Sequence, residues 1–577
     1  MSLARSRPAP LALSLIAALA CAAALAPQAA RACGGTFCDA GPTVMPVDQT
    51  GENILFWIDD AGGEPHTEAH IQIQYEGDAE RFAWIVPVTA APDVLVSSQA
   101  LFDNVLAGTQ RTLVVNTRSD TCPDSGGVSF CLAADEFDFA DTGFNGLTGF
   151  GGETGGGEGG MGTGPEIIER GVAGAFEYVI LTGETIDVIV DWLDEAGYAQ
   201  DDDAPPILDE YLQEGFVFVA FKLRGGVGVD EIHPIAIRYP GTEPCIPIRL
   251  TRIAAVDDMA IRAFFLGDAR VAPQNWPHVE LNLARLNWLG SLASAYTQLV
   301  SAAIDEAGGR AFITEYAGTD AVVSTTNIDD PAWNAAAYAG LDPVATLAEM
   351  EDQGLMQCGA VACNFFHPQV EPLLQRYLPA PDDFEDEQEF WASLDLYVDL
   401  IDPDAWAAQP GLGAELDERI FTPGDHALDM LADASYLTRL FTLLSPHEML
   451  EDPLFHETEG LPTVDSQLST TRVFACGDSP DYFEHPDGRV VALDDGLYPS
   501  FADMPAAARI EEVPMTGPPQ VQTDNAALTD EIIETSNQSK LVGPSPSCAV
   551  SRVRPEAVLG MLALFGLAWL HRAPRRD

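Results

Sequence analysis

The chain has 577 residues, of which 28 are Lys or Arg and 89 are Asp or Glu, so its formal net charge at pH 7 is -61. Nucleic acid is excluded as a partner, because phosphate binding needs a basic surface and this surface would repel it. A hydrophobic content of 47% is enough for substantial buried cores, and the length predicts two or three domains.

Residues 1–32 have the pattern of a signal peptide. Two arginines precede an apolar stretch from Leu11 to Leu25, and the small residues Ala30 and Ala32 stand at positions -3 and -1 of a cleavage site. Cleavage after Ala32 would leave Cys33 as the first residue. Lipidation of Cys33 is an alternative, although the residues before the cut suit a lipoprotein signal poorly. We therefore expect an exported protein.

Residues 33–270 are predicted to form one α+β domain with antiparallel strands and a few helices. Within "HTEAHIQIQY", apolar and polar residues alternate with the period of a half-buried strand, which predicts a sheet with one solvent-exposed face. A short helix is expected over 97–106, and "IPIRLTRIA" is expected to be a strand. Between residues 142 and 164, twelve of 23 residues are glycine, which indicates a flexible insertion.

Residues 275–500 are predicted to be mainly helical with short strands. The strongest helical pattern covers Leu281 to Ala307, and a further packed helix is expected from Tyr436 to Leu444. Residues 501–547 are rich in Pro, Thr, Ser and Asn, which favours a stalk. The predicted fold class is therefore α+β, with a β-rich first part followed by a mainly helical half.

The last segment, residues 548–577, contains Cys548, an apolar run from Ala557 to Leu570 and an arginine-rich end. The run would cover about 21 Å as a helix, which is less than the hydrocarbon thickness of a bilayer. The pattern resembles the tripartite C-terminal sorting tails of myxobacterial surface proteins. That resemblance implies processing by membrane-bound sorting machinery, with Cys548 carried to the outer membrane or cell surface. A short helix that stays as a membrane anchor is the alternative.

The cysteine count agrees with export. Apart from the signal peptide and the tail, eight cysteines remain, and an even number in an exported chain is typical of disulfides. The sequence does not choose among the possible pairings, but three of them would close short loops: Cys33 with Cys38, Cys122 with Cys131 and Cys358 with Cys363. The pairing of Cys245 with Cys476 would then join two distant regions. The eight candidates are Cys33, Cys38, Cys122, Cys131, Cys245, Cys358, Cys363 and Cys476.

The best candidate metal ligands are His66, Glu68 and His70, which lie on one face of the predicted strand and could present two imidazoles and a carboxylate to Zn²⁺. That face is also expected to meet solvent, and no fourth ligand is evident. The acidic stretches at 201–203 and 382–387 could collect Ca²⁺, but neither has a calcium-loop pattern, so solvated charge is the simpler interpretation. No resident cofactor is therefore expected.

No local motif indicates catalysis. "HEMLEDPLFH" lacks the spacing of a zinc protease, because position 451 is Glu451 where the second histidine should stand. Phosphate-binding loops and serine-nucleophile motifs are missing from the sequence. Cys33 could act as an N-terminal nucleophile, but a disulfide to Cys38 would silence it. We expect a non-enzymatic binding or structural protein of the cell surface, with an envelope protein or polysaccharide as its partner. The alternative is a secreted hydrolase with a dispersed, metal-assisted site.

Seven ordered segments of the chain resemble one bacterial family, the domain of unknown function 2330. The segments run from "ACGGTFC" through "AHIQIQYEGDAERFAWIVPV", "FVAFKL" and "IHPIAIRYPG" to "TRLFTLLSPHEMLEDPLF", and the likeness extends from about Cys33 to Asp495. The resemblance implies an exported protein of α+β organisation, often with a C-terminal sorting tail. It implies no activity.

Overall fold

A computed structural model describes residues 36–38, 48–59, 65–76, 82–121, 165–196, 203–225, 227–381, 384, 387–407, 411–477 and 479–541. The predicted signal peptide with Ala32, the glycine-rich insertion and the C-terminal tail lie outside these residues. Four of the cysteines also lie outside the described residues: Cys33, Cys122, Cys131 and Cys548. The same holds for the side chain of Cys38. The described chain mixes helices with several sheets, which confirms the α+β class.

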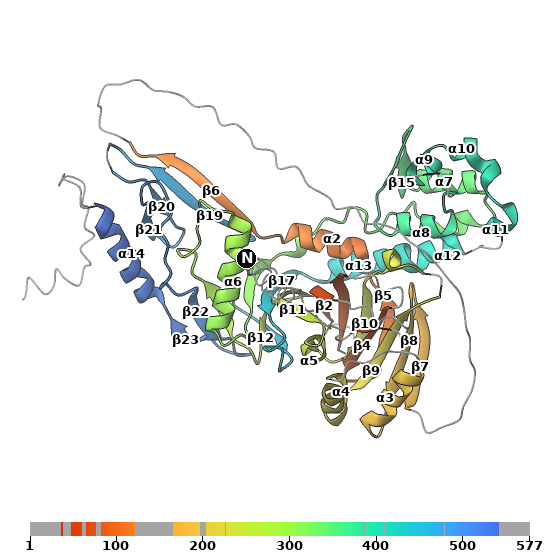
Figure 1. The fold of residues 1–577 in the computed structure, drawn as a ribbon, viewed down its shortest axis with the longest axis horizontal. Coiled ribbons are helices and arrows are strands. Elements are labelled where there is room, and N and C mark those ends of the chain that lie inside the picture. The colour runs from red at the N-terminus through yellow and green to blue at the C-terminus, as the bar shows by residue number, and fades with distance from the viewer. Residues whose placement is uncertain are drawn as a thin grey trace, which may run out of the picture.

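The centre of the molecule is a seven-stranded sheet with the strand order β14-β17-β11-β2-β3-β10-β5 (Figure 1). All neighbours are antiparallel except β2 and β11, which are parallel. The strands are β2 (Asp48–Asp59), β3 (His66–Glu76), β5 (Asp93–Val96), β10 (Ile235–Pro240), β11 (Ala255–Gly267), β14 (Ile313–Gly318) and β17 (Tyr436–Leu444).

Both faces of this sheet are buried. On β2, Ile54 and Phe56 belong to one hydrophobic core, while Leu55 and Trp57 belong to a second core on the opposite face. In the register of β2 with β3, Glu68 lies opposite Trp57 and therefore on the side of the second core. The prediction that this face of β3 meets solvent is therefore wrong, because the second core covers it.

Two helices cover that face, α2 (Gln99–Gly108) and α13 (Thr422–Asp433) (Figure 1). The Ser98 hydroxyl caps α2 by accepting a hydrogen bond from the Leu101 amide. Helix α13 approaches the chain at Ile328 so closely that a Cβ on Gly424 would lie 2.0 Å from the Ile328 carbonyl oxygen. Glycine at this position lets the helix lie against its neighbour.

A second sheet packs against the other face of the first, with the antiparallel strand order β1-β4-β9-β8-β7. The largest core lies between the two sheets, and helices α3 and α4 cover the outer face of the second one. These elements are β1 (Thr36–Cys38), β4 (Phe82–Val88), β7 (Glu166–Ala173), β8 (Phe176–Thr182), β9 (Val217–Leu223), α3 (Ile186–Glu195) and α4 (Ala204–Gln213).

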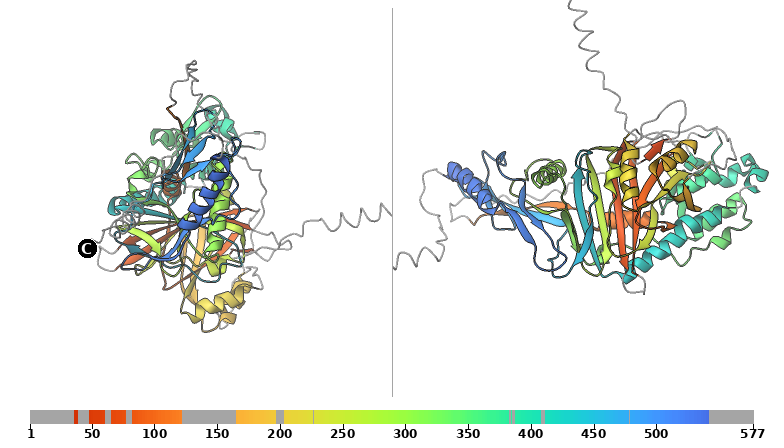
Figure 2. Two further views of the ribbon diagram at one scale, coloured as in Figure 1. Left: turned by 90° about the vertical axis from the view of Figure 1, so that its left-hand side faces the viewer. Right: turned by 90° about the horizontal axis from the view of Figure 1, so that it is seen from below.

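A helical lobe with its own hydrophobic core stands at one end of the molecule (Figures 1 and 2). It contains α7 (Pro343–Asp352), α8 (Val370–Tyr377), α9 (Glu387–Ala392), α10 (Leu394–Tyr397), α11 (Pro403–Ala407), α12 (Leu412–Leu416) and the hairpin β15 (Met356–Cys358) with β16 (Cys363–Phe365).

Buried charges connect this lobe to the sheets. Arg419, in the π-helical turn η5 (Asp417–Phe421), has no exposed side-chain surface and contacts Glu231 at 2.7 Å and Glu415 at 2.8 Å. Arg376 on α8 binds the same two carboxylates. Because Glu231 belongs to the turn η1 (Val229–Glu231) just before β10, the ion pairs fix the lobe to the central sheet.

The opposite end holds the C-terminal strands and α14 (Ala526–Leu541) (Figure 2). One sheet has the order β21-β20-β19-β6 and another the order β13-β22-β23. Their strands are β6 (Thr112–Ser119), β13 (His278–Leu281), β19 (Gln467–Phe474), β20 (Tyr482–Glu484), β21 (Val490–Ala492), β22 (Ala507–Glu512) and β23 (Gln520–Asp524). The remaining elements are α5 (Ile248–Thr251), α6 (Leu292–Glu306), η2 (Asp320–Val322), η3 (Ala335–Tyr338), η4 (Val398–Leu400) and the pair β12 (Arg270–Pro273) with β18 (Phe455–Thr458).

Several sequence predictions need correction. The chain does not divide near residue 270, because β14 and β17 from the second part complete the central sheet. The segment from Tyr436 to Leu444 is a strand, since β11 and β14 flank it on both sides. Residues 507–541 are no stalk, because β22 pairs with β13 and α14 follows. "IPIRLTRIA" contains α5 in place of a strand. Within the described ranges, no helix has the length and apolar character to cross a membrane.

Candidate functional site

The covered face of β3 carries a buried carboxylate that organises the candidate site. Glu68 has no exposed side-chain surface. Arg238 lies directly opposite it on β10, and its Nε donates a hydrogen bond of 2.7 Å to Oε1 of Glu68. The Arg238 Nη2 atom lies 2.5 Å from the same oxygen. Arg238 therefore neutralises the carboxylate on one side and leaves Oε2 for other contacts.

His70 lies two residues further along β3 and is also buried. Its Nδ1 lies 2.8 Å from the Ser97 hydroxyl, and its Nε2 lies 3.4 Å from Oε2 of Glu68. That Nε2 atom is buried and has no hydrogen-bond partner. Burial lowers the pKa of His70, although the negative charge of Glu68 opposes the shift.

The third side chain comes from α13. His426 Nε2 lies 2.8 Å from Oε2 of Glu68, and the ring stands edge-on to Trp57. Burial alone would raise the pKa of Glu68, but the hydrogen bond with His426 and the nearby His70 ring outweigh it and hold the pKa well below its usual range. Arg238 stabilises the same ionised form, so Glu68 is a carboxylate at neutral pH.

His66 lies at the edge of this group and not within it. Its Nε2 is 3.8 Å from Oε1 of Glu68, the oxygen that Arg238 already holds, and its Nδ1 is 3.8 Å from Asp59. One ligand atom each from Glu68, His70 and His426 lie within 4.8 Å of one another. The structure thus brings together two of the three predicted ligands and supplies His426 in place of His66.

The sequence offered no local signal for His426. This residue lies 358 positions after Glu68, and α13 contains no second histidine or cysteine at helical spacing. Only the packing of α13 over β3 brings the two together. A carboxylate and two imidazoles in one buried group form a donor set that zinc and iron commonly use.

The structure also places the other sequence candidates. Cys358 and Cys363 form a disulfide, as predicted for this close pair. Cys245 is a free cysteine, so its predicted pairing with Cys476 is wrong; Cys476 is disulfide-bonded. His456 is buried on β18, where its Nε2 lies 3.0 Å from the Val513 carbonyl oxygen, which is a structural contact. Most of the two acidic stretches lies outside the described residues.

The comparisons with known proteins give one finding. The family model described as "Uncharacterized protein conserved in bacteria (DUF2330)" matches residues 27–349, which is more than half of the chain. The match contains Glu68 and His70 and ends before His426. No curated protein and no solved structure matches the chain. On the strength of the family match, the chain belongs to the DUF2330 family of uncharacterized bacterial proteins.

Proposed function

We propose that this chain is an exported protein of the cell envelope, held at the outer membrane or cell surface through its C-terminal tail. Its folded body would serve as a non-enzymatic binding or structural module. The sequence supports the proposal through the signal-peptide pattern of residues 1–32 and the order of cysteine, apolar run and arginines in residues 548–577. Its partners at this stage would be the export and sorting machinery.

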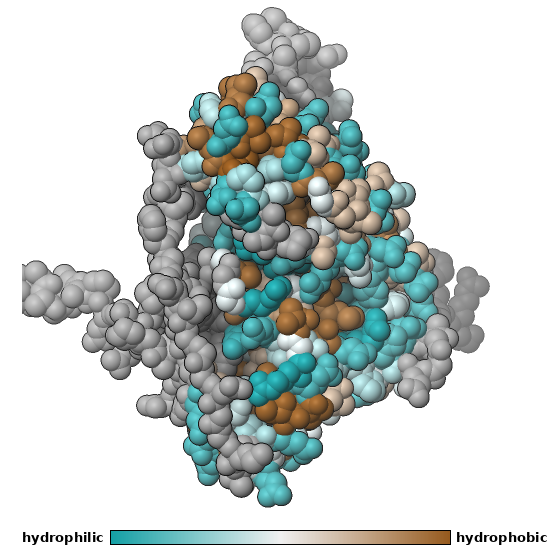
Figure 3. Space-filling model, turned by 90° about the vertical axis from the view of Figure 1, so that its right-hand side faces the viewer, coloured by the Kyte–Doolittle hydropathy of each residue, from teal (hydrophilic) through white to brown (hydrophobic). Residues whose placement is uncertain are grey.

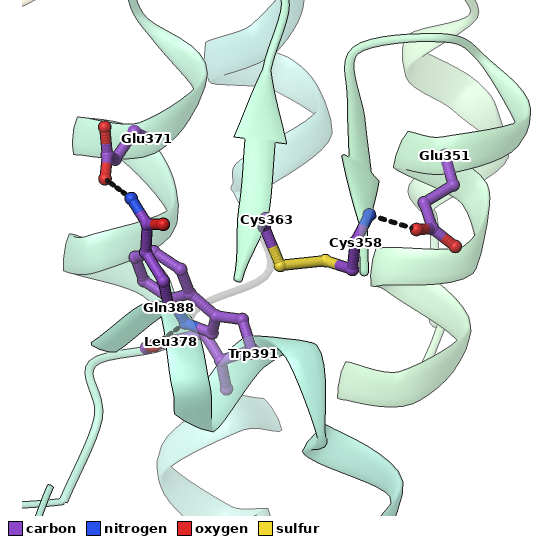
Figure 4. Close-up of a disulfide and its surroundings, with 7 residues drawn as sticks. All are labelled: Glu351, Cys358, Cys363, Glu371, Leu378, Gln388 and Trp391. Carbon is purple, nitrogen blue, oxygen red and sulfur yellow. Dashed lines mark hydrogen bonds between the residues drawn. A yellow bond between two sulfur atoms is a disulfide. The ribbon is translucent and has the colours of Figure 1, made fainter. Parts of the chain in front are cut away.

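The observation that carries the proposal is the disulfide in the helical lobe (Figure 4). Cys358 and Cys363 are register partners on the hairpin strands β15 and β16, and the Glu351 carboxylate accepts a hydrogen bond of 2.6 Å from the Cys358 amide. Disulfides persist in oxidising compartments and are rare in the reducing cytosol. A bond built into a hairpin of a folded lobe therefore favours a location outside the cytoplasm.

The surface supports binding of a protein or polysaccharide. A net charge of -61 keeps the body hydrated and repels polyanions. Apolar surface gathers at the end of the molecule that carries the helical lobe (Figure 3), and the lobe exposes Leu396, Val398 and Leu400. An apolar patch within an acidic surface is suited to contact with an uncharged or basic envelope component.

The state of the thiols tests the proposed compartment. Protein taken from cells under acid quench is denatured and alkylated without reduction, and the labelled peptides are identified by mass spectrometry. We expect no label at Cys358 and Cys363 until a reductant is added. Cys245 provides the control within the same chain, because it is free and should react as soon as the protein unfolds. Labelling of Cys358 and Cys363 without reduction would overturn the proposed exterior location.

The role of the tail is tested separately. Cells that carry the native chain and cells that carry the Cys548→Ala variant are fractionated, and the C-terminus is followed with an antibody. We expect the native chain at the cell surface with a processed end, and the variant unprocessed. Equal distribution of both chains with intact C-termini would refute the proposed anchoring.

A second candidate function is a secreted hydrolase with a metal-assisted site. One observation favours it, the convergence of Glu68, His70 and His426 on one point. Hydrolysis of envelope substrates by the purified native chain, lost in His426→Ala, would support this function over the binding role.

A further inference from the structure

We propose that Glu68, His70 and His426 bind one Zn²⁺ ion that joins the central sheet to helix α13. This inference goes beyond the proposed location and holds wherever the chain resides. It rests on the positions of three side chains from β3 and α13 and on a buried nitrogen that lacks a partner.

Two of the three distances between ligand atoms suit one small ion, and all three atoms lie within 4.8 Å of one another. Zinc lies about 2.0–2.1 Å from histidine nitrogen and carboxylate oxygen, so tetrahedral ligand atoms stand about 3.3 Å apart. Oε2 of Glu68 and Nε2 of His70 are already 3.4 Å apart. Oε2 and Nε2 of His426 are 2.8 Å apart and would have to separate by about 0.5 Å to reach the tetrahedral spacing. A rotation of the His426 side chain on the helix can supply that small movement.

The unpartnered nitrogen of His70 is an independent indication. The Ser97 hydroxyl fixes one side of the ring through Nδ1, and the buried Nε2 lies 3.4 Å from Oε2 of Glu68 without a hydrogen bond. Histidines that bind metals are commonly held in this way, with the second ring nitrogen bonded to a neighbouring polar group. A buried polar atom without a partner is costly, and an ion at this position would satisfy it.

Arg238 limits and shapes the site. Its guanidinium occupies Oε1 of Glu68, so the carboxylate can offer only Oε2, as a single-oxygen ligand. Its positive charge also opposes a cation nearby, which should make zinc binding weaker than at a site without it. The same bond keeps Glu68 ionised and correctly oriented when the ion is absent.

The exposure of the ligands locates the open coordination position. Glu68 and His70 are buried, whereas the His426 side chain is 27% exposed. With three protein ligands, a tetrahedral ion keeps one position for water, and this position would face the solvent side of His426. The ion would link segments that lie 358 positions apart in the sequence. Because the ion would bind only to the folded state, it would stabilise the docked helix α13.

The test uses the full-length chain, isolated from cells, stripped with a chelator and titrated with ZnCl₂ against a zinc-sensitive dye. We expect one ion per chain and an increase in melting temperature on zinc addition. Removing a polar group that only orients a ligand typically lowers metal affinity about 10–100-fold. Removing a ligand itself should therefore lower zinc affinity about 100-fold or more. His426→Ala and His70→Ala should both show this loss.

His66→Ala is the matched control, because His66 is on the same face of the same strand but lies outside the proposed ligand set. It should bind zinc like the native chain. Far-ultraviolet circular dichroism confirms that each variant is folded, and a tetrahedral absorption spectrum with Co²⁺ reports the coordination directly. The proposal is overturned if the native chain binds no stoichiometric zinc, or if folded His426→Ala binds it with native affinity. An equal loss in His66→Ala would also overturn it. Each of these results leaves the proposed export of the chain untouched.

Discussion

Glu52 on β2 is a buried carboxyl group whose Oε2 atom lacks a hydrogen-bond partner, and replacing it with glutamine should stabilise the protein in a pH-dependent way. The residue is 5% exposed, its Oε2 atom has no hydrogen-bond partner, and its neighbours in the register include Ile261 on β11. Burial raises the pKa of Glu52 from 4.5 to about 7. The native protein therefore keeps a proton that the unfolded chain releases above pH 4.5.

The sign and size of the effect follow from this difference. Between pH 4.5 and about 7, the folded state binds more protons than the unfolded state, so the contribution of Glu52 to stability falls as the pH rises. At about 1.4 kcal/mol per pH unit, the total loss is about 3 kcal/mol, of which about 2.5 kcal/mol falls between pH 5 and pH 8. Glu52→Gln cannot ionise and avoids this loss.

The assay is urea unfolding at pH 5 and at pH 8, followed by tryptophan fluorescence, with the free energy of unfolding extrapolated to water. The stability of Glu52→Gln relative to the native chain should increase by about 2.5 kcal/mol from pH 5 to pH 8. Glu68→Gln is the matched control on the adjacent strand. Because Glu68 is ionised and paired with Arg238, its replacement should cost about 3 kcal/mol at pH 8. A difference between Glu52→Gln and the native chain that stays constant or shrinks as the pH rises would refute the reasoning.

Three further changes test other parts of the fold. Arg419→Met should lower the free energy of unfolding by about 3–5 kcal/mol, because it leaves Glu231 and Glu415 buried with one cation fewer; chemical denaturation measures this loss. Gly424→Ala should lower the free energy of unfolding by about 1–3 kcal/mol, because the new Cβ collides with the Ile328 carbonyl. Amide hydrogen exchange in α13 should become faster, and unchanged exchange would contradict this packing. Cys358→Ser should lower the free energy of unfolding by about 2 kcal/mol, the amount expected for opening a loop with a sequence separation of 5. The β15–β16 hairpin should also become more sensitive to protease. Equal protease resistance would argue against a stabilising role for the disulfide.

Local patterns predicted many elements of the first part of the chain. The alternation in "HTEAHIQIQY" correctly indicates the strand β3, and the short helix expected at 97–106 corresponds to α2. These signals depend on neighbouring residues, which the sequence shows directly. The disulfide between Cys358 and Cys363 was predictable for the same reason, because its two cysteines are close in sequence.

The parts that failed depend on distant contacts. A two-residue period shows that the two faces of β3 differ, but it does not reveal that α13 covers the polar one. The segment from Tyr436 to Leu444 is rich in leucine, which favours a helix, yet it pairs with strands on both sides and is buried almost throughout. His426 was missed because its ligand-type neighbours come from another region of the chain.

The position of β17 in the central sheet constrains the order in which the protein can assemble. This strand lies between β11 and β14, so a growing chain cannot close the sheet until residue 444 has been synthesised. A truncated chain that stopped at residue 349, where the family match ends, would lack both β17 and α13. It would leave β11 and β14 with unpaired edges and uncover Glu68 and His70. The family-matched segment is therefore an incomplete folding unit, and biochemical work on this protein needs the later residues as well.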